Sequence, residues 1–300
     1  MSGAVSKAVL VTGCSTGIGR ATAERLARRG WTVYASARRP ESIKDLADVG
    51  CKLLTLDVAD EESRRAAIAD VEAAEGAVGA LVNNAGFSLG GPVEEVPLDD
   101  WRRQFETNLF GMIHLIQLAL PGMRRQRWGR IANISSIGGR LTFPGAGAYH
   151  ASKHAVEAMS DALRFEVKPF GVRVSVIEPG LIKTKFGDTA VSTAADRGGD
   201  GPYAEFMTGV ATRTAGAYEG PMAMMASSPD RVANVVERAL RRRWPRPRYR
   251  VTAGARVLLL TRALTTDRGW DRVVRTAYPP PKPEDVRPPG GPPSIRGGGR

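Results

Sequence analysis

The chain has 300 residues, of which 42% are hydrophobic and 25% charged, and its formal net charge is +12. This length can bury one sizeable α/β core, no apolar run is long enough to cross a bilayer, and no secretory segment precedes the first expected strand, so we expect a cytoplasmic protein. The two cysteines, Cys14 and Cys51, exclude a disulfide framework and lack metal-ligand spacing, so we expect reduced thiols and no metal site.

Apolar stretches of strand length alternate with amphipathic stretches along most of the chain. Strands are expected near residues 7–12, 31–37, 52–57, 79–83, 129–134, 172–177 and 248–252, and helices near residues 17–29, 60–74, 99–126, 148–168 and 229–242. Ser228 can cap the last of these helices, and Pro229 suits its first position. The alternation predicts a Rossmann-like, doubly wound parallel sheet with helices on both faces, in which ligands bind at the carboxyl ends of the strands.

The first expected strand leads into a glycine-rich turn, Thr12-Gly13-Cys14-Ser15-Thr16-Gly17-Ile18-Gly19. Its Gly-x3-Gly-x-Gly spacing differs from the general G-x-G-x-x-G fingerprint, and an ordinary tight turn is the alternative. Its place between a strand and a helix favours dinucleotide binding, because glycines let the backbone approach a pyrophosphate and a helix N-terminus offers free N–H groups. We expect no reactive role for Cys14.

The end of the second expected strand favours a phosphorylated cofactor. An NAD-binding site carries an acidic residue there, about 20 residues after the glycines, to bind the ribose 2′-hydroxyl. This chain has Ala37, Arg38 and Arg39 instead. Guanidinium groups bind a 2′-phosphate by charge-assisted hydrogen bonds, so the sequence predicts NADP(H) rather than NAD(H), with Arg38 as the main contact. A solvated arginine pair is the alternative.

Tyr149 and Lys153 lie four residues apart in an expected helix, which places a phenol and an ammonium side by side. A neighbouring cation favours the phenolate, so we expect Lys153 to lower the pKa of Tyr149 from roughly 10 toward neutral pH. Such a group suits reversible carbonyl and alcohol chemistry. We reject His150 as the base, because the next residue along a helix points to a different face.

Four motifs, in order, resemble those of the short-chain dehydrogenase/reductase family, from about Lys7 to about Arg243. They are the glycine turn, Asn83-Asn84-Ala85-Gly86, Ile134-Ser135-Ser136 and Tyr149-x-x-x-Lys153. The family also carries an Asn in a long helix and a Pro-Gly after the sixth strand, matched here by Asn108 and Pro179-Gly180. The resemblance implies an NAD(P)-dependent oxidoreductase acting on CH–OH groups.

The resemblance also implies the individual cofactor contacts. Asp57 and Val58 would meet the adenine ring, although capping of the next helix is an alternative role for Asp57. Ile182 and Thr184 would hold the nicotinamide carboxamide and a phosphate. The other implied contacts are Gly13, Ser15, Thr16, Gly17, Ile18 and Gly19 of the turn, Asn84, Ala85 and Gly86 along the adenosine ribose, and Tyr149, Lys153, Pro179 and Gly180.

The mechanism implied by the resemblance combines hydride exchange at the nicotinamide with proton exchange between Tyr149 and the substrate oxygen. Ser136, thirteen residues before Tyr149, would hold the carbonyl oxygen with a second hydrogen bond. Lys153 would bind the nicotinamide ribose. Asn108, through its backbone and a water, would help relay protons to Lys153.

The regular alternation fails between Pro179 and Ser228, where Gly, Ala, Thr and four methionines are frequent: Met207, Met222, Met224 and Met225. Long loops in compact domains are often lids, and in the family this segment covers the substrate, so we expect a lid over about residues 183–228. Adaptable methionines and few charges favour a small hydrophobic substrate, although the methionines could simply pack a core.

A C-terminal extension over about residues 244–278 follows the family match. We expect residues 1–278 to form one catalytic domain and the proline- and glycine-rich residues 279–300 to be a disordered tail. The arginine-rich run 241–250 is expected to be a solvated face, and no nucleic acid is expected as a partner. A peripheral membrane contact through Val257 to Leu264 is a minority interpretation.

Three functions remain open. The favoured one is an NADP(H)-dependent carbonyl reductase or alcohol dehydrogenase. The others are a nucleotide-binding regulator without turnover, and a membrane- or nucleic-acid-associated binding protein that uses its basic C-terminus. Members of the family are commonly dimers or tetramers, so we expect a homodimer or homotetramer; the apolar run Met112 to Leu120 fits this, but burial within one subunit would explain it equally.

Overall fold

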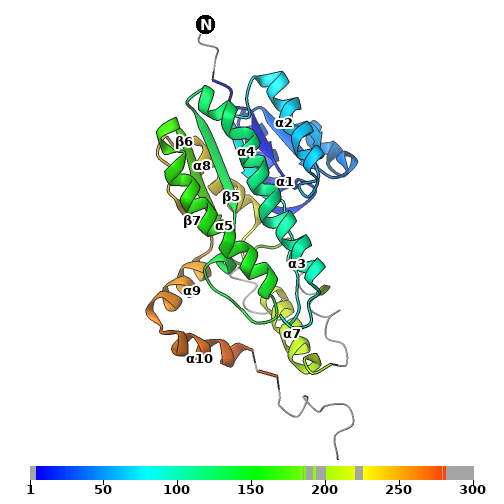
Figure 1. Cartoon of the computed structure of the whole chain (residues 1–300), viewed down its shortest axis with the longest axis vertical. Coiled ribbons are helices and arrows are strands. Elements are labelled where there is room, and N and C mark those ends of the chain that lie inside the picture. The colour runs from blue at the N-terminus through cyan, green and yellow to red at the C-terminus, as the bar shows by residue number, and fades with distance from the viewer. Residues whose placement is uncertain are drawn as a thin grey trace, which may run out of the picture.

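The computed structural model describes residues 5–184, 186, 192–193, 201–219, 226–278 and 280–281. Within them, seven parallel strands form one sheet in the order β3-β2-β1-β4-β5-β6-β7 (Figure 1). The strands are β1 (Val9–Val11), β2 (Val33–Ala37), β3 (Lys52–Thr55), β4 (Ala80–Asn83), β5 (Gly129–Ile134), β6 (Val172–Glu178) and β7 (Arg248–Arg250). The predicted Rossmann-like fold is confirmed.

Helices cover both faces of this sheet, because alternate residues of each strand point to opposite sides. In β1, Val9 and Val11 enter one apolar cluster, whereas Leu10 enters the other. The first cluster is completed by α1 (Gly17–Arg28), the 3-10 helix η1 (Pro40–Ala47) and α8 (Pro229–Arg241). The second is completed by α2 (Glu61–Glu75), α4 (Gly111–Arg125) and α5 (Gly147–Glu166). The chain thus forms the three layers expected.

The helix expected over residues 99–126 is interrupted, which corrects the prediction. The observed elements are α3 (Leu98–Phe105), a π-helical turn η2 (Glu106–Phe110) and then α4. The Gly111 N–H donates to the Glu106 carbonyl five residues earlier, which widens the helix by one residue. Such turns occur frequently at functional sites.

The strand order identifies where a ligand can enter. β1 pairs with β2 on one side and with β4 on the other. The chain therefore runs outward from β1 through β2 and β3, and then crosses back to β4 on the opposite side of β1. A crevice opens at the carboxyl ends of the strands where the order reverses in this way. The short 3-10 helix η3 (Ile137–Gly139) follows β5 at the same edge, and η4 (Lys168–Phe170) precedes β6.

Among the described residues, α7 (Ala204–Glu219), α9 (Ala253–Leu264) and α10 (Asp267–Ala277) contribute to neither of these two apolar clusters. In Figure 1, α9 and α10 extend from the lower end of the sheet, and α7 lies below it. Much of the expected lid, and the expected tail apart from residues 280 and 281, lie outside the described residues. Ser228 occupies the N-cap position of α8, but its side chain makes no capping bond.

The expectations about membrane spans, metal sites and cysteines concern the described residues. Among them, no helix is long and apolar enough to cross a membrane, and no cluster of His, Cys, Asp and Glu could hold a metal ion. Cys14 and Cys51 are both buried and free. Burial raises the pKa of the Cys14 thiol to about 12, so this thiol is protonated and unreactive at neutral pH.

Candidate functional site

A cavity of about 1250 Å³ lies at the carboxyl edge of the sheet. Its walls come from segments that are far apart in the sequence: the loops that follow the strands, α7, and the C-terminal helices α9 and α10. Of the twenty residues predicted for the site, eighteen line this cavity, and the exceptions are Gly19 and Asn108. The two exceptions lie directly behind the wall, Gly19 under the glycine turn and Asn108 behind Gly86.

The glycine turn is shaped for a ligand that approaches the backbone. Gly13 and Gly17 have φ angles of +71° and +61°, which glycine adopts readily. A side chain on Gly13 would lie 2.9 Å from the Cα of Ala85, and one on Gly19 would collide with the carbonyl oxygen of Gly13. Thr16 is the N-cap residue of α1 and its side chain makes no capping bond. The first N–H groups of α1 therefore face the cavity without a side-chain cap, as a pyrophosphate site requires.

Thr12 holds two of the predicted segments together, a role that the sequence analysis missed. Its Oγ1 accepts hydrogen bonds from the N–H groups of Asn84 and Ala85, each at 2.9 Å. The Asn84 side-chain amide donates in return to the carbonyls of Thr12 and Gly13, at 2.9 and 3.1 Å. The loop after β4 is thereby fixed against the glycine turn. A threonine directly before the first glycine was the available signal.

Arg38 and Arg39 follow β2 and line the cavity next to Ser42. Both side chains are exposed, and neither has an acidic partner among the described residues. Two cations are therefore available at the place where an acidic residue would bind an unmodified ribose. The residues of the turn and these arginines fit a dinucleotide that carries a 2′-phosphate.

The alternative role of Asp57 as a helix cap is wrong. The α2 cap is Asp60, whose Oδ1 accepts from the Ser63 N–H. Asp57 instead accepts from the Ala59 N–H at 2.9 Å and lines the cavity next to Val58. This position after β3 leaves Asp57 beside the expected adenine position.

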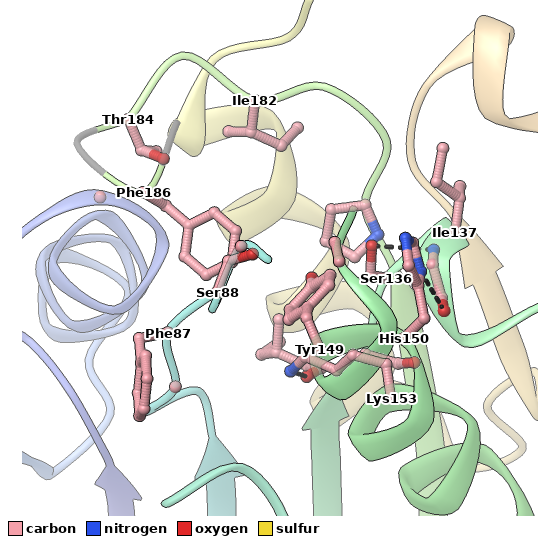
Figure 2. A pocket seen from close by; sticks show the side chains of 18 of the residues that line it. Phe87, Ser88, Ser136, Ile137, Tyr149, His150, Lys153, Ile182, Thr184 and Phe186 are labelled. Carbon is pink, nitrogen blue, oxygen red and sulfur yellow. Dashed lines mark hydrogen bonds between the residues drawn. The ribbon is translucent and has the colours of Figure 1, made fainter. Parts of the chain in front are cut away.

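Ser136, Tyr149 and Lys153 meet on one wall of the cavity (Figure 2). Ser136 follows β5, whereas Tyr149 and Lys153 belong to the first two turns of α5. The Ser136 side chain acts on the Tyr149 phenol, because it opposes part of the rise that burial causes in the Tyr149 pKa. The Lys153 Nζ lies 6.0 Å from the centre of the Tyr149 ring and donates to the carbonyl oxygen of Ile134 at 2.8 Å. The predicted spacing therefore does bring phenol, hydroxyl and amine together.

The electrostatic part of that prediction needs correction. Burial raises the pKa of Tyr149 to about 12, and the group that opposes this is the hydrogen bond from Ser136 rather than the amine. Burial also lowers the pKa of Lys153 to about 8, and the Glu157 carboxylate counteracts part of this shift. Tyr149 is thus a neutral phenol at neutral pH.

His150 has a structural role, although its ring lies close to Tyr149, with 5.6 Å between ring centres. Its Nδ1 donates to the Gly138 carbonyl at 2.9 Å, and its Nε2 accepts from the Phe143 N–H at 3.2 Å. Both nitrogens are used by the neutral ring, and burial lowers the His150 pKa. His150 is therefore no free base, because its nitrogens are occupied rather than because it points elsewhere.

Asn108 lies in the π-helical turn and is completely buried. Its Oδ1 accepts from the Phe87 N–H at 3.1 Å, and its Nδ2 donates to the Phe87 carbonyl at 3.0 Å and to the Ser152 Oγ at 3.1 Å. A side chain on Gly86 would lie 3.0 Å from Asn108 Oδ1 and 3.8 Å from Lys153 Nζ. The Asn108 side chain thus fixes the loop after β4. Only the backbone of Asn108 is then left for the expected proton relay.

The end of the cavity away from the glycine turn is largely apolar. The Phe186 ring lies tilted beside the Tyr149 ring, with 5.6 Å between ring centres, and Figure 2 shows both rings facing the same space. Phe143 contacts the rings of Trp270 and Tyr278 at centre distances of 6.4 and 6.0 Å. Val210 of α7 and Val274 of α10 complete this wall. None of these residues was predicted as a site residue, because no motif marks them.

The segments after β6 bring the remaining predicted contacts to the cavity. Ile182 pairs with Ser227 in an isolated parallel bridge, and Thr184 lies against Gly17, where a side chain would be 3.1 Å from its Cγ2. Met207 is buried in a small cluster with Val210 and does not line the cavity, so the core-packing alternative is correct for it. Met222, Met224 and Met225 lie outside the described residues.

Comparison with known proteins agrees with this geometry. Residues 7–195 match the family described as short chain dehydrogenase. The uncharacterized oxidoreductase YbbO of Escherichia coli (strain K12) is 34% identical over 90% of this chain and 95% of its own length. An NADPH-dependent 3-dehydrocapnine reductase of Ornithobacterium rhinotracheale is 38% identical over 65% of this chain and 70% of its own length. The crystal structure of a short-chain dehydrogenase from Streptomyces avermitilis aligns with a TM-score of 0.76 at 34% identity, covering 92% of this chain and 99% of that one.

Proposed function

Because the chain belongs to the short-chain dehydrogenase/reductase family of oxidoreductases, we propose that it interconverts a carbonyl and an alcohol on a small hydrophobic substrate, with NADP(H) as cofactor. The observation that carries this proposal is the meeting of Ser136, Tyr149 and Lys153 on one wall of the cavity that also contains the glycine turn. A proton donor, a hydrogen-bond donor and a dinucleotide cradle are the components that this reaction needs.

Tyr149 and Ser136 both act on the oxygen atom of the substrate in this proposal. A bound nicotinamide would supply or accept the hydride at the substrate carbon. Tyr149 donates its proton to the carbonyl oxygen during reduction and removes the hydroxyl proton during oxidation. Ser136 donates a second hydrogen bond to the same oxygen, where negative charge develops. A Tyr149 pKa of about 12 keeps the phenol protonated at neutral pH, which suits the donor role in reduction.

Lys153 and Asn108 support this proton transfer. Lys153 holds its amine at the Ile134 carbonyl, next to the expected nicotinamide ribose, and replaces the proton that Tyr149 gives up. Its pKa of about 8 suits such an exchange near neutral pH, because both forms of the amine are accessible. Asn108, directly behind Gly86, fixes the loop on which this arrangement depends and offers its backbone for the relay.

The preference for NADP(H) is supported by Arg38, exposed at the end of β2 with no acidic partner among the described residues. The relative from Ornithobacterium rhinotracheale, whose name includes NADPH, points the same way. The rings of Phe143, Phe186, Trp270 and Tyr278 support a hydrophobic substrate. Residues 1–278 form one catalytic domain in this proposal, with a lid near 183–228. A cytoplasmic homodimer or homotetramer is its working form.

Replacing Tyr149 by Phe tests the reaction itself. We expect turnover of apolar ketones with NADPH to fall by at least about a hundredfold, because general acid catalysis is lost while the cavity keeps its shape. NADPH binding, followed by its fluorescence, should stay within about threefold of the unmodified protein. A variant that retains full turnover would contradict the proposal.

Replacing Arg38 by Asp tests the cofactor preference. The NADPH affinity is expected to fall by about a hundredfold, because a charge-assisted contact is lost and a carboxylate repels the 2′-phosphate. NADH affinity should rise, because the carboxylate can accept from the 2′-hydroxyl. The neighbouring Arg39→Asp variant is the matched control and should change the NADPH to NADH ratio much less. Equal effects of the two variants, or equal affinities of the unmodified protein for both cofactors, would count against Arg38.

A further inference from the structure

The outer face of α9 carries apolar side chains that nothing among the described residues covers. Val257, Leu260 and Leu264 are 63%, 59% and 78% exposed, and their i, i+3, i+7 spacing places them on one face of the helix. The opposite face packs inward, where Ala255 and Leu259 are buried. A helix that is apolar on both sides is expected to be covered on both sides. This outer face of α9 therefore needs an occupant.

The charge around this face indicates the occupant. Residues 253–277 contain five arginines and two aspartates. Arg268, Arg272 and Arg275 follow an i, i+4, i+7 spacing on α10, so they form one stripe along that helix. All three are exposed, none has an acidic partner among the described residues, and only Thr265 and Thr266 separate α10 from α9. Exposed apolar side chains and unpaired arginines on adjoining helices are typical of segments that lie on anionic bilayers.

A second copy of the chain fits this face poorly. In a two-fold contact of the α9 and α10 arm, each copy would contribute three unpaired arginines, and like charges in a contact oppose association. The C-terminal residues 279–300 also offer little to cover it, since Val286 and Ile295 are their only aliphatic side chains apart from proline. An anionic lipid surface satisfies both the apolar face and the arginine stripe.

The position of the arm formed by α9 and α10 connects this surface to the cavity. Figure 1 shows the two helices extending from the lower end of the sheet. Leu258 of α9 and Trp270, Val273 and Val274 of α10 line the cavity. Val273 is 40% exposed and lines the cavity. The arm that carries the outer face of α9 is therefore also part of the cavity wall.

We propose that the arm of α9 and α10 docks the protein on anionic membrane surfaces, with Val257, Leu260 and Leu264 entering the interface and the α10 arginines contacting lipid phosphates. The use of this contact, delivery of a membrane-dissolved substrate, rests on the proposed function. The contact itself does not, because vesicle binding requires no turnover.

Flotation of the full-length protein with vesicles tests the proposal. Binding to phosphatidylglycerol vesicles should exceed binding to phosphatidylcholine vesicles by about tenfold or more and should weaken in high salt. The triple variant V257S/L260S/L264S should lose at least about thirtyfold of the vesicle affinity, because three apolar side chains no longer enter the interface. The variant R268Q/R272Q/R275Q should lose the preference for the anionic lipid.

A matched pair of single substitutions serves as the control, in case the triple variant folds poorly. Leu264→Ser should weaken vesicle binding, whereas Leu98→Ser should not, although Leu98 is 63% exposed on α3. Both variants should retain the unmodified kcat/KM for a water-soluble ketone. The proposal is overturned if the protein does not prefer anionic vesicles, if Leu98→Ser weakens binding as much as Leu264→Ser, or if the triple variant only dissociates an oligomer.

Discussion

Lys153 carries its amine at a place where charge is unfavourable. It is 5% exposed, and burial lowers its pKa from 10.5 to about 8. A lysine in the unfolded chain keeps its proton up to about pH 10.4. Below about pH 8 the Lys153 amine is charged in both the folded and the unfolded protein, and burial of that charge destabilises the folded protein. This destabilisation disappears as the pH rises from about 8 to about 10.5. The site therefore keeps its amine at the expense of stability, as expected for a functional group.

Replacing Lys153 by Met should consequently stabilise the protein at pH 7 and abolish turnover. The pKa difference corresponds to roughly 3 kcal/mol, and loss of the hydrogen bond to Ile134 offsets about 1 kcal/mol, which leaves a gain of about 2 kcal/mol. Urea unfolding at pH 7 and pH 10 measures this gain, which should shrink at the higher pH. The exposed Lys44→Met variant is the control and should change stability by less than about 0.5 kcal/mol. A destabilised Lys153→Met variant at pH 7 would contradict the argument.

Sequence spacing predicted the meeting of Tyr149 and Lys153 because four residues always make one helical turn. It did not predict the direction of the Tyr149 pKa shift, because burial depends on what the rest of the chain places around the ring. Nor did it predict the bonds of His150, since its partners Gly138 and Phe143 lie on a loop whose path no pattern specifies. The sequence thus predicted which side chains lie close together within one helix, but not the burial or the hydrogen-bond partners that the rest of the chain gives them.

At the scale of elements, the π-helical turn between α3 and α4 holds the cofactor side of the site in place. Arg64 of α2 donates to the Val58 carbonyl at 2.5 Å, to Glu106 at 3.0 Å and to the His114 ring at 3.0 Å. The Val58 carbonyl also approaches Gly111 so closely that any side chain there would collide with it. The sequence could not show this break, because one extra residue in a turn leaves the apolar periodicity of the long helix almost unchanged.

Replacing Gly111 by Ala should therefore disturb both stability and cofactor binding. The added methyl group has no space beside Val58, so we expect a loss of about 1–3 kcal/mol in the free energy of unfolding and a severalfold weaker NADPH affinity. Gly216→Ala in α7 is the matched control, because nothing lies within 4 Å of its added carbon. In a helix interior that change should stabilise by up to about 1 kcal/mol. Thermal unfolding and NADPH titration of both variants measure these effects, and a harmless Gly111→Ala change would contradict the packing argument.

At the scale of the whole molecule, the two ends of the cavity have different origins. The cofactor end is built by the loops after the strands, whose motifs the sequence shows, as with Gly13, Asn84 and Pro179. The substrate end joins Phe143 to Trp270 and Tyr278, which are more than a hundred residues away. Pairings over that distance leave no pattern in a single sequence. The fold and the family were therefore predictable, and the substrate wall was not.

Substitution of Trp270 should therefore disturb the substrate end of the cavity and leave the cofactor end unchanged. It is 6% exposed and packs with Leu141 and Leu259 in a cluster apart from the two clusters that flank the sheet. Replacing it by Ala should remove about 3–5 kcal/mol of the packing free energy that holds α9 and α10 in place. These two helices should therefore unfold locally more often, while the sheet stays folded.

Hydrogen exchange provides the measurement for Trp270→Ala. Protection should fall over residues 253–277 but not in β1, β4 or β5, and the KM for an apolar ketone should rise by about tenfold or more. NADPH affinity should remain within about twofold, because the glycine turn and Arg38 follow β1 and β2, which stay folded. Trp244→Ala is the matched control, since Trp244 is 62% exposed and contacts only arginine guanidinium groups among the ring contacts of the described residues. If Trp270→Ala lowered protection throughout the sheet, the arm and the sheet would unfold as one unit, and the substrate wall would be part of the central core.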